Sequence, residues 1–133
     1  MTHDTDSILI SIKKLLNIED IDTAFDADIM MLINSEFVTL QQLGVGPASG
    51  FSIQGPEDTW VEYVDDPLLR ETARTYIYLR VRMIFDPPAS SVVSDAINAR
   101  MSELEWRLQH QAEYDRMQED HIVTQNKSKY TEE

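Results

Sequence analysis

Apolar residues recur at helical spacing at the start of the chain. Between residues 7 and 16 they fall at Ile8, Leu9, Ile12, Leu15 and Leu16. This spacing places them on one face of a helix. Asp4, Asp6 or Ser7 can cap its first turn, and Lys13 and Lys14 lie near the negative end of its dipole. We therefore predict a short helix over about residues 5 to 17.

A second helix is predicted over about residues 24 to 43. Thr23 can cap it with Asp26 at the third helical position, and the chain from Phe25 to Leu43 contains no glycine or proline. Its apolar residues occupy more than one stripe, so we expect this helix to have neighbours on two sides.

Residues 44–66 form a long connection that holds all four glycines and two of the five prolines of the chain. Phe51 and Ile53 flank a serine as in a short strand, and Thr59 can cap one helical turn that reaches Val64. Such loops are uncommon unless they serve as binding or contact elements. Because Phe51, Ile53 and Trp60 are too apolar for a free linker, two roles stay open: they cap the bundle, or they anchor a neighbouring subunit.

A third helix is predicted from Pro67 to Phe85, where Asp86 and two prolines end it. Arg80 falls in the middle of its apolar face. An unpaired buried charge is costly. Arg80 therefore either extends its guanidinium past a small neighbour into solvent, or pairs with the acid-rich first half of another copy.

A fourth helix begins at Ser90 or Ser91 and keeps its apolar spacing through Leu108. Beyond that point the chain is polar but free of helix breakers, so helix is expected to continue to about residue 120 without a broad apolar face. Residues 125–133 read as a polar tail. These elements predict an all-α fold: a four-helix bundle with a long loop between the second and third helices and a polar C-terminal extension.

Composition and charge narrow the functional classes. The 133 residues are 42% apolar and 26% charged, which is typical of one folded domain. The net charge is −13, and residues 1–66 alone hold 13 acidic residues and two lysines, a net charge of −11. This distribution argues against nucleic-acid binding and against attraction to anionic membranes. No apolar run has the length of a membrane span, and residues 1–6 do not resemble a signal peptide, so we expect a protein that acts inside a cell or particle.

Residues suited to catalysis or metal binding are scarce. The chain has no cysteine, which removes disulfides, thiolate zinc sites and thiol nucleophiles together. His3, His110 and His121 lie in polar terminal segments without the spacing of metal ligands, and no serine has a nearby histidine in a structured stretch. We therefore expect no enzymatic activity, no cofactor and no metal site.

Several segments together carry a more specific signal. The most specific is the aromatic, arginine-bearing helix from Thr75 to Phe85, which ends in Asp86-Pro87-Pro88. Weaker matches are Ile10 to Leu16, the helix from Ile29 that ends in Leu43-Gly44-Val45-Gly46-Pro47, the segments Gly50-Phe51-Ser52-Ile53 and Thr59-Trp60, and the helix that contains Glu103 to Leu108. Over about residues 7 to 108 the chain resembles the small all-α head-tail connector (adaptor) proteins of long-tailed bacteriophages.

The resemblance implies a structural virion protein without catalysis. Such a protein forms a ring of roughly twelve copies beneath the portal protein of the capsid, receives a tail-completion or stopper protein below, and leaves a channel for DNA passage. We divide the chain into residues 1–108, a helical connector domain, and residues 109–133, a polar helical extension and flexible tail to which the resemblance does not extend. Because this tail has no apolar face, we expect it to order only when it docks on the portal. The expected localisation is the head-tail interface of the virion, and the host cytoplasm during assembly.

In such a ring the acidic first half of one copy can face the basic side chains of the next. The residues expected at subunit or partner interfaces are Phe51, Ile53, Trp60, Arg70, Arg74, Arg80, Arg82, Arg100 and Arg107. The alternative function is a small cytoplasmic helical protein-interaction module or regulator that acts as a monomer or dimer.

Overall fold

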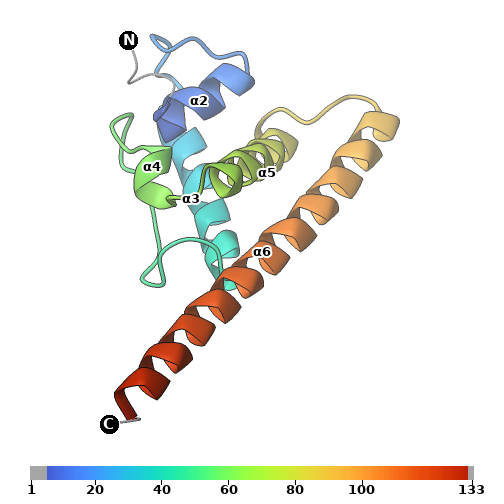
Figure 1. The fold of residues 1–133 in the computed structure, drawn as a ribbon. Helices are drawn as coiled ribbons and strands as arrows, with labels where there is room; N and C mark the ends of the chain where they lie inside the picture. The colour runs from blue at the N-terminus through green and yellow to red at the C-terminus, as the bar shows by residue number, and fades with distance from the viewer. Residues whose placement is uncertain (1–5, 132–133) are drawn as a thin grey trace.

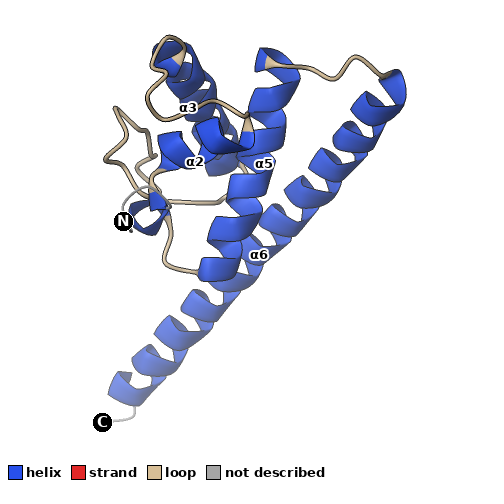
Figure 2. Ribbon diagram, turned by 90° about the horizontal axis from the view of Figure 1, so that it is seen from above, coloured by secondary structure: helices blue, strands red, loops and turns tan. Residues whose placement is uncertain are grey.

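The computed structural model describes residues 6–131, and residues 128–131 by their backbone alone. Five helices appear in this range: α2 (Ile8–Leu15), α3 (Asp26–Gln42), α4 (Trp60–Tyr63), α5 (Pro67–Phe85) and α6 (Ser91–Thr131). No strand forms within residues 6–131, where the β pairing is a single isolated bridge between Ser7 and Thr59. The predicted all-α fold with four longer helices is confirmed (Figures 1 and 2).

Helix α5 is the central element because it packs against each of the other four helices. Its buried residues Ala73, Tyr76, Ile77 and Val81 have essentially no exposed surface. Helices α2 and α3 lie on one side of α5, and α6 runs obliquely along the other (Figures 1 and 2). The apolar stripe of each helix therefore faces α5, as expected for a helical domain around one core.

The helix boundaries follow local capping chemistry. The Ser7 hydroxyl accepts a hydrogen bond from the backbone N–H of Ile10, and the Asp66 carboxylate accepts one from Leu68 before Pro67 opens α5. Thr59 caps α4 by accepting from the backbone N–H of Glu62. The predicted start and end of α5 and the predicted short turn after Thr59 are confirmed.

Three sequence expectations about local structure are wrong. Thr23 does not cap α3: Phe25 occupies the cap position without a side-chain hydrogen bond, and the helix begins at Asp26. Residues 51–53 form no strand, because the Asn34 side chain occupies both the N–H and the C=O of Ile53 (2.8 and 3.0 Å). Helix α6 continues to Thr131 rather than ending near residue 120.

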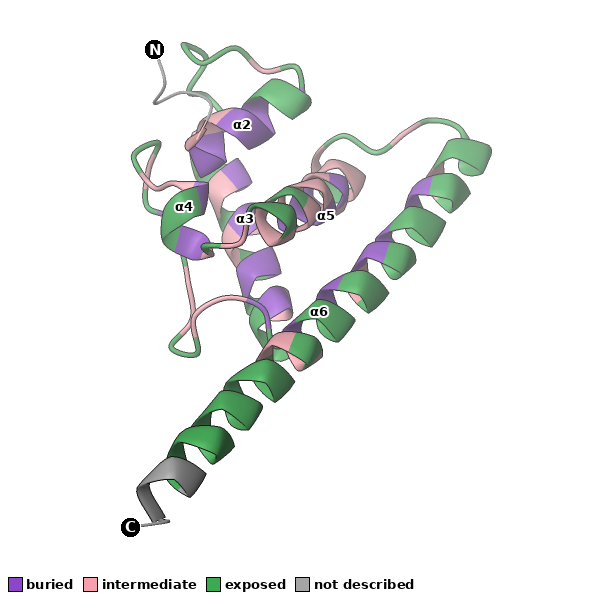
Figure 3. Cartoon of the chain, in the orientation of Figure 1, coloured by how far each residue is buried: buried purple, intermediate pink, exposed green. Residues whose placement is uncertain are grey.

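Helix α6 has a packed half and a projecting half. Ile97, Met101, Leu104, Leu108 and Ala112 are buried against the rest of the domain. After Ala112 the described side chains are half-buried at most, and from Arg116 to Lys127 they are all exposed (Figure 3). We call residues 113–131 the overhang. Because it contains no glycine or proline, the helix propagates past the point where packing ends.

Candidate subunit interface

The aromatic and apolar residues of the connection 44–66 face inward. Trp60 is 3% exposed, and its indole Nε1 donates to Ser11 Oγ at 2.9 Å. Ile53 is also 3% exposed. Phe51 is half-buried and makes an edge contact with Phe37, with ring centroids 5.1 Å apart. Of the two roles left open for these residues, capping the bundle is the one that their contacts within the subunit describe.

Arg80 has a partner within its own chain. Its Nε donates to Glu36 Oε2 at 2.9 Å, and the Glu36 side chain is only 5% exposed whereas that of Arg80 is 37% exposed. The hydrogen bond to Glu36 raises the pKa of Arg80 above its ordinary value. The guanidinium also lies 6.0 Å from the ring centre of Tyr76. The pair holds α3 against α5, so Arg80 needs no second copy to balance its charge.

Three of the other arginines form ion pairs along their own helix. Arg74 pairs with Glu71, while Glu103 lies between Arg100 (3.0 Å) and Arg107 (2.6 Å). These pairs are exposed and contribute little to stability. They therefore leave Arg74, Arg100 and Arg107 free to contact another molecule.

Arg70 and Arg82 differ from the rest. Arg70 donates from Nη2 to the carbonyl of Asp65 at 2.7 Å, whereas its buried Nε has no hydrogen-bond partner within the described residues. Arg82 is half-buried near the end of α5 and forms no ion pair with any residue the structure describes. The nine predicted interface residues therefore divide into three that pack within their own subunit, one arginine in an intrachain pair between helices, and five half-buried or exposed arginines.

A buried lysine is the functional feature that the sequence did not reveal. The Lys13 side chain is 2% exposed, and its ammonium donates to the carbonyls of Asp22 (2.7 Å) and Asp20 (3.2 Å). Asp26 Oδ1 lies 2.8 Å away as an ionic contact without hydrogen-bond geometry. Lys13 thereby ties the segment between α2 and α3 to the end of α2. The neighbouring Lys14 is exposed.

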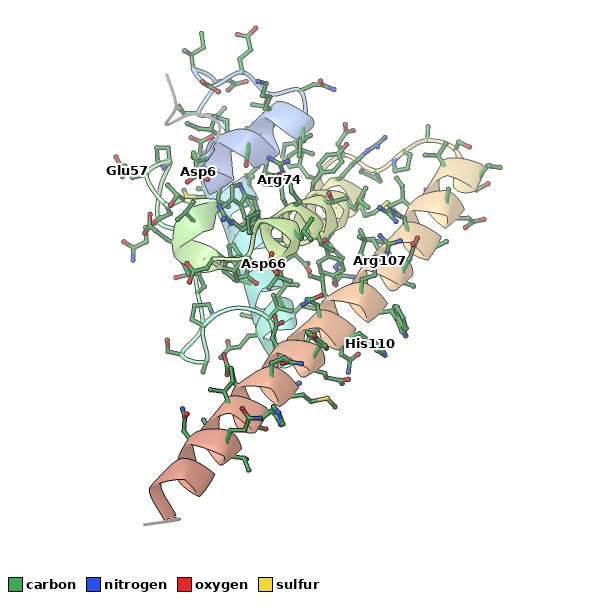
Figure 4. All side chains as sticks on the ribbon, in the orientation of Figure 1. Asp6, Glu57, Asp66, Arg74, Arg107 and His110 are labelled. Carbon is green, nitrogen blue, oxygen red and sulfur yellow. The ribbon has the colours of Figure 1, made fainter. Side chains whose placement is uncertain are left out.

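An open hollow lies between the first turn of α5 and the middle of α6. Its volume is about 440 Å³, and Leu68, Leu69, Trp106, Leu108 and Tyr114 form its apolar lining. Asp66, Arg107 and His110 stand around it (Figure 4). Leu68 is 79% exposed and Trp106 61% exposed. Large aromatic side chains in exposed hollows are common at the centre of protein interfaces.

The structure gives no pattern of metal ligation or membrane insertion in the range it describes. Within residues 6–131 no group of three or more His, Asp or Glu side chains could hold a metal ion. The described helices include none that is long and apolar enough to cross a membrane. His3 lies outside the described residues.

A family model described as phage connector protein matches residues 8–115. No curated protein and no solved structure matches the chain. The matched range begins at the first residue of α2 and ends three residues after Ala112, the last buried residue of α6. The match therefore covers the packed body of the molecule and most of the chain. The chain belongs to the phage connector protein family, a family of structural proteins of the virion.

Proposed function

We propose that the protein is a head-tail connector that forms a ring beneath the portal protein and joins the capsid to the tail. The observation that supports this proposal is the family match over residues 8–115, which spans α2 to the packed half of α6. The ring holds roughly twelve copies in a cyclic arrangement in which each subunit uses two different faces. The protein catalyses no reaction; its role is mechanical.

The overhang of α6 is the element we assign to the portal. Its side chains from Arg116 to Lys127 are exposed, and they include three large apolar residues, Met117, Ile122 and Val123, that are each more than half exposed. A helix that leaves its own domain unburied is expected to find its contacts on another molecule. A tail-completion or stopper protein binds the opposite side of the ring.

The negative net charge of each copy favours passage of DNA through the ring without binding. With a net charge of −13 per copy, a ring concentrates negative potential around its channel. DNA is then repelled from the wall and moves through without being held. The accessible arginines, Arg70, Arg74, Arg82, Arg100 and Arg107, are proposed to face neighbouring copies or the portal rather than the channel.

A mass measurement tests the proposal. Light scattering coupled to size exclusion is carried out on the protein alone and with purified portal rings. We expect a complex in which about twelve copies of the protein are bound to one portal ring. A chain that remains a monomer or dimer under both conditions, and does not bind the portal, contradicts the proposal and favours a small regulator.

A further inference from the structure

The segment between α2 and α3 presents one apolar side chain among carboxylates. Ile21 is 85% exposed. Glu19, Asp20 and Asp22 around it are exposed as well, and none of them forms an ion pair within the described residues. A large aliphatic side chain with this exposure makes few contacts within its own subunit. We call residues 19–22 the acidic loop.

The acidic loop is held in one conformation before any contact with a partner. The Lys13 ammonium donates hydrogen bonds to two backbone carbonyls of the loop, those of Asp20 and Asp22, and contacts the Asp26 carboxylate where α3 begins. The backbone N–H of Asp22 donates to the carbonyl of Glu19 at 3.0 Å, which closes a turn around Ile21. A loop ordered in advance loses less conformational entropy when it binds. A buried ammonium in this position is therefore consistent with a recognition element.

The hollow between α5 and α6 has the complementary chemistry. Leu68, Trp106 and Tyr114 provide apolar surface for an aliphatic side chain. Arg107 and His110 lie at the edge of the hollow. The carboxylate that lines it, that of Asp66, already accepts a hydrogen bond from the backbone N–H of Leu68. Arg100 and Arg107 share one carboxylate, that of Glu103, so the two guanidinium groups have a single ion-pair partner between them within the described residues.

The acidic loop and the hollow cannot meet within one subunit. The loop follows α2 at one end of the molecule, whereas the hollow lies beside the middle of α6, on the other side of α5 (Figures 1 and 2). Two complementary surfaces at separate places generate a head-to-tail contact, which closes into a ring when the rotation allows.

We propose that the acidic loop of one copy docks in the hollow of the next copy, with Ile21 inserted between Leu68 and Trp106. Glu19, Asp20 and Asp22 then face Arg107 and His110 of the neighbour. The exposed ion pair between Arg107 and Glu103 contributes little free energy, so Arg107 can exchange Glu103 for a carboxylate of the neighbour at a small free-energy cost. This inference rests on the proposed ring and names the contact that builds it.

Site-directed crosslinking tests the contact without background because the chain contains no cysteine. Ile21→Cys and Leu68→Cys are made as single variants and as a double variant, and each is treated with a short bis-maleimide after assembly on portal rings. We expect the double variant to give a ladder of crosslinked multimers. A mixture of the two single variants gives dimers only, and neither single variant alone gives crosslinked product.

A matched control replaces the hollow position by an exposed position elsewhere. Val38 on α3 is 55% exposed, and the pair Ile21→Cys with Val38→Cys is expected to give no ladder. A ring that assembles on the portal without the ladder from Ile21→Cys and Leu68→Cys overturns this inference and leaves the proposed function intact. Crosslinked dimers from Ile21→Cys alone also overturn it, because they indicate a symmetric loop-to-loop contact. Failure of the unsubstituted protein to assemble at all overturns the proposed function itself.

Discussion

Replacement of Lys13 by methionine isolates the contribution of the buried ammonium. Methionine keeps the apolar stem of the side chain and removes its charge and its donors. The carbonyls of Asp20 and Asp22 then lose their hydrogen bonds, and the Asp26 carboxylate loses its ionic partner. The perturbation is confined to the connection between α2 and α3.

The size of the effect follows from burial. Hydrogen bonds to a charged group contribute about 1.5–3 kcal/mol each, and removal of one member of a buried ion pair costs about 3–5 kcal/mol. These figures are not additive, and Asp26 is 23% exposed, so water replaces part of what the carboxylate loses. We expect Lys13→Met to lower the free energy of unfolding by about 2–4 kcal/mol, a large part of the roughly 5–15 kcal/mol of a typical domain.

Urea denaturation followed by far-ultraviolet circular dichroism measures this change. With a slope of about 2 kcal/mol per molar urea, the midpoint is expected to fall by about 1–2 M. Lys14→Met is the matched control, because Lys14 is the adjacent lysine on the same helix and is exposed. It should change stability by less than about 0.5 kcal/mol. Equal midpoints for the two variants would refute the role assigned to Lys13.

Three further outcomes are expected. Gly46 has φ +91°, and a Cβ at this position would lie 2.6 Å from Tyr63 Cε1. Gly46→Ala should therefore lower the free energy of unfolding, measured by urea denaturation, by about 2–4 kcal/mol. Gly55→Ala, where φ is not positive, should lower it by less than about 1 kcal/mol. Burial raises the pKa of Tyr63, whose hydroxyl has no hydrogen-bond partner among the described residues. The free energy of unfolding should therefore fall above about pH 10, where the phenol ionises in the unfolded chain but not in the folded one. In Tyr63→Phe it should fall less, and at pH 7 this variant should be at least as stable as the original protein. Deletion of residues 116–133 should change the free energy of unfolding by less than about 0.5 kcal/mol, because every described side chain from Arg116 to Lys127 is exposed, and should abolish portal binding, measured by co-sedimentation.

The predictable part of the fold is the part specified by local chemistry. Helix α5 begins at Pro67 behind the cap Asp66 and ends before Asp86, as its breakers indicate. The start of helix α3 differs from the sequence expectation: Thr23 and Asp26 have the pattern of a capping box, but the helix begins at Asp26 with Phe25 at its cap position. The carbonyl of Asp22, directly before Thr23, binds the Lys13 ammonium, a contact that the local sequence pattern does not contain.

The partner of Arg80 could have been found from the sequence. Glu36 lies on the same face of α3 as Ile29, Ile33 and Leu40, so an acid interrupts the apolar face of one helix and an arginine that of another. Opposite charges on two apolar faces are more simply explained by contact within one chain than by contact between copies. The spacing places Lys13 on the flank of the apolar stripe of α2, between Leu9 and Leu16, and Lys14 away from it. It does not show that the ammonium of Lys13 binds carbonyls of the following loop.

Charge alone does not explain how copies of this chain recognise one another. Each copy carries a net charge of −13, so two copies repel at distances where only total charge matters. At physiological ionic strength this repulsion is screened beyond about 8 Å, and short-range contacts decide which surfaces meet. Since Arg74 and Arg107 already have carboxylate partners in their own chain, a contact with another copy gains orientation from them rather than most of its affinity. An exposed apolar residue on a rigid loop, such as Ile21, supplies what the charges lack: a contact that becomes favourable only when a matching hollow is present.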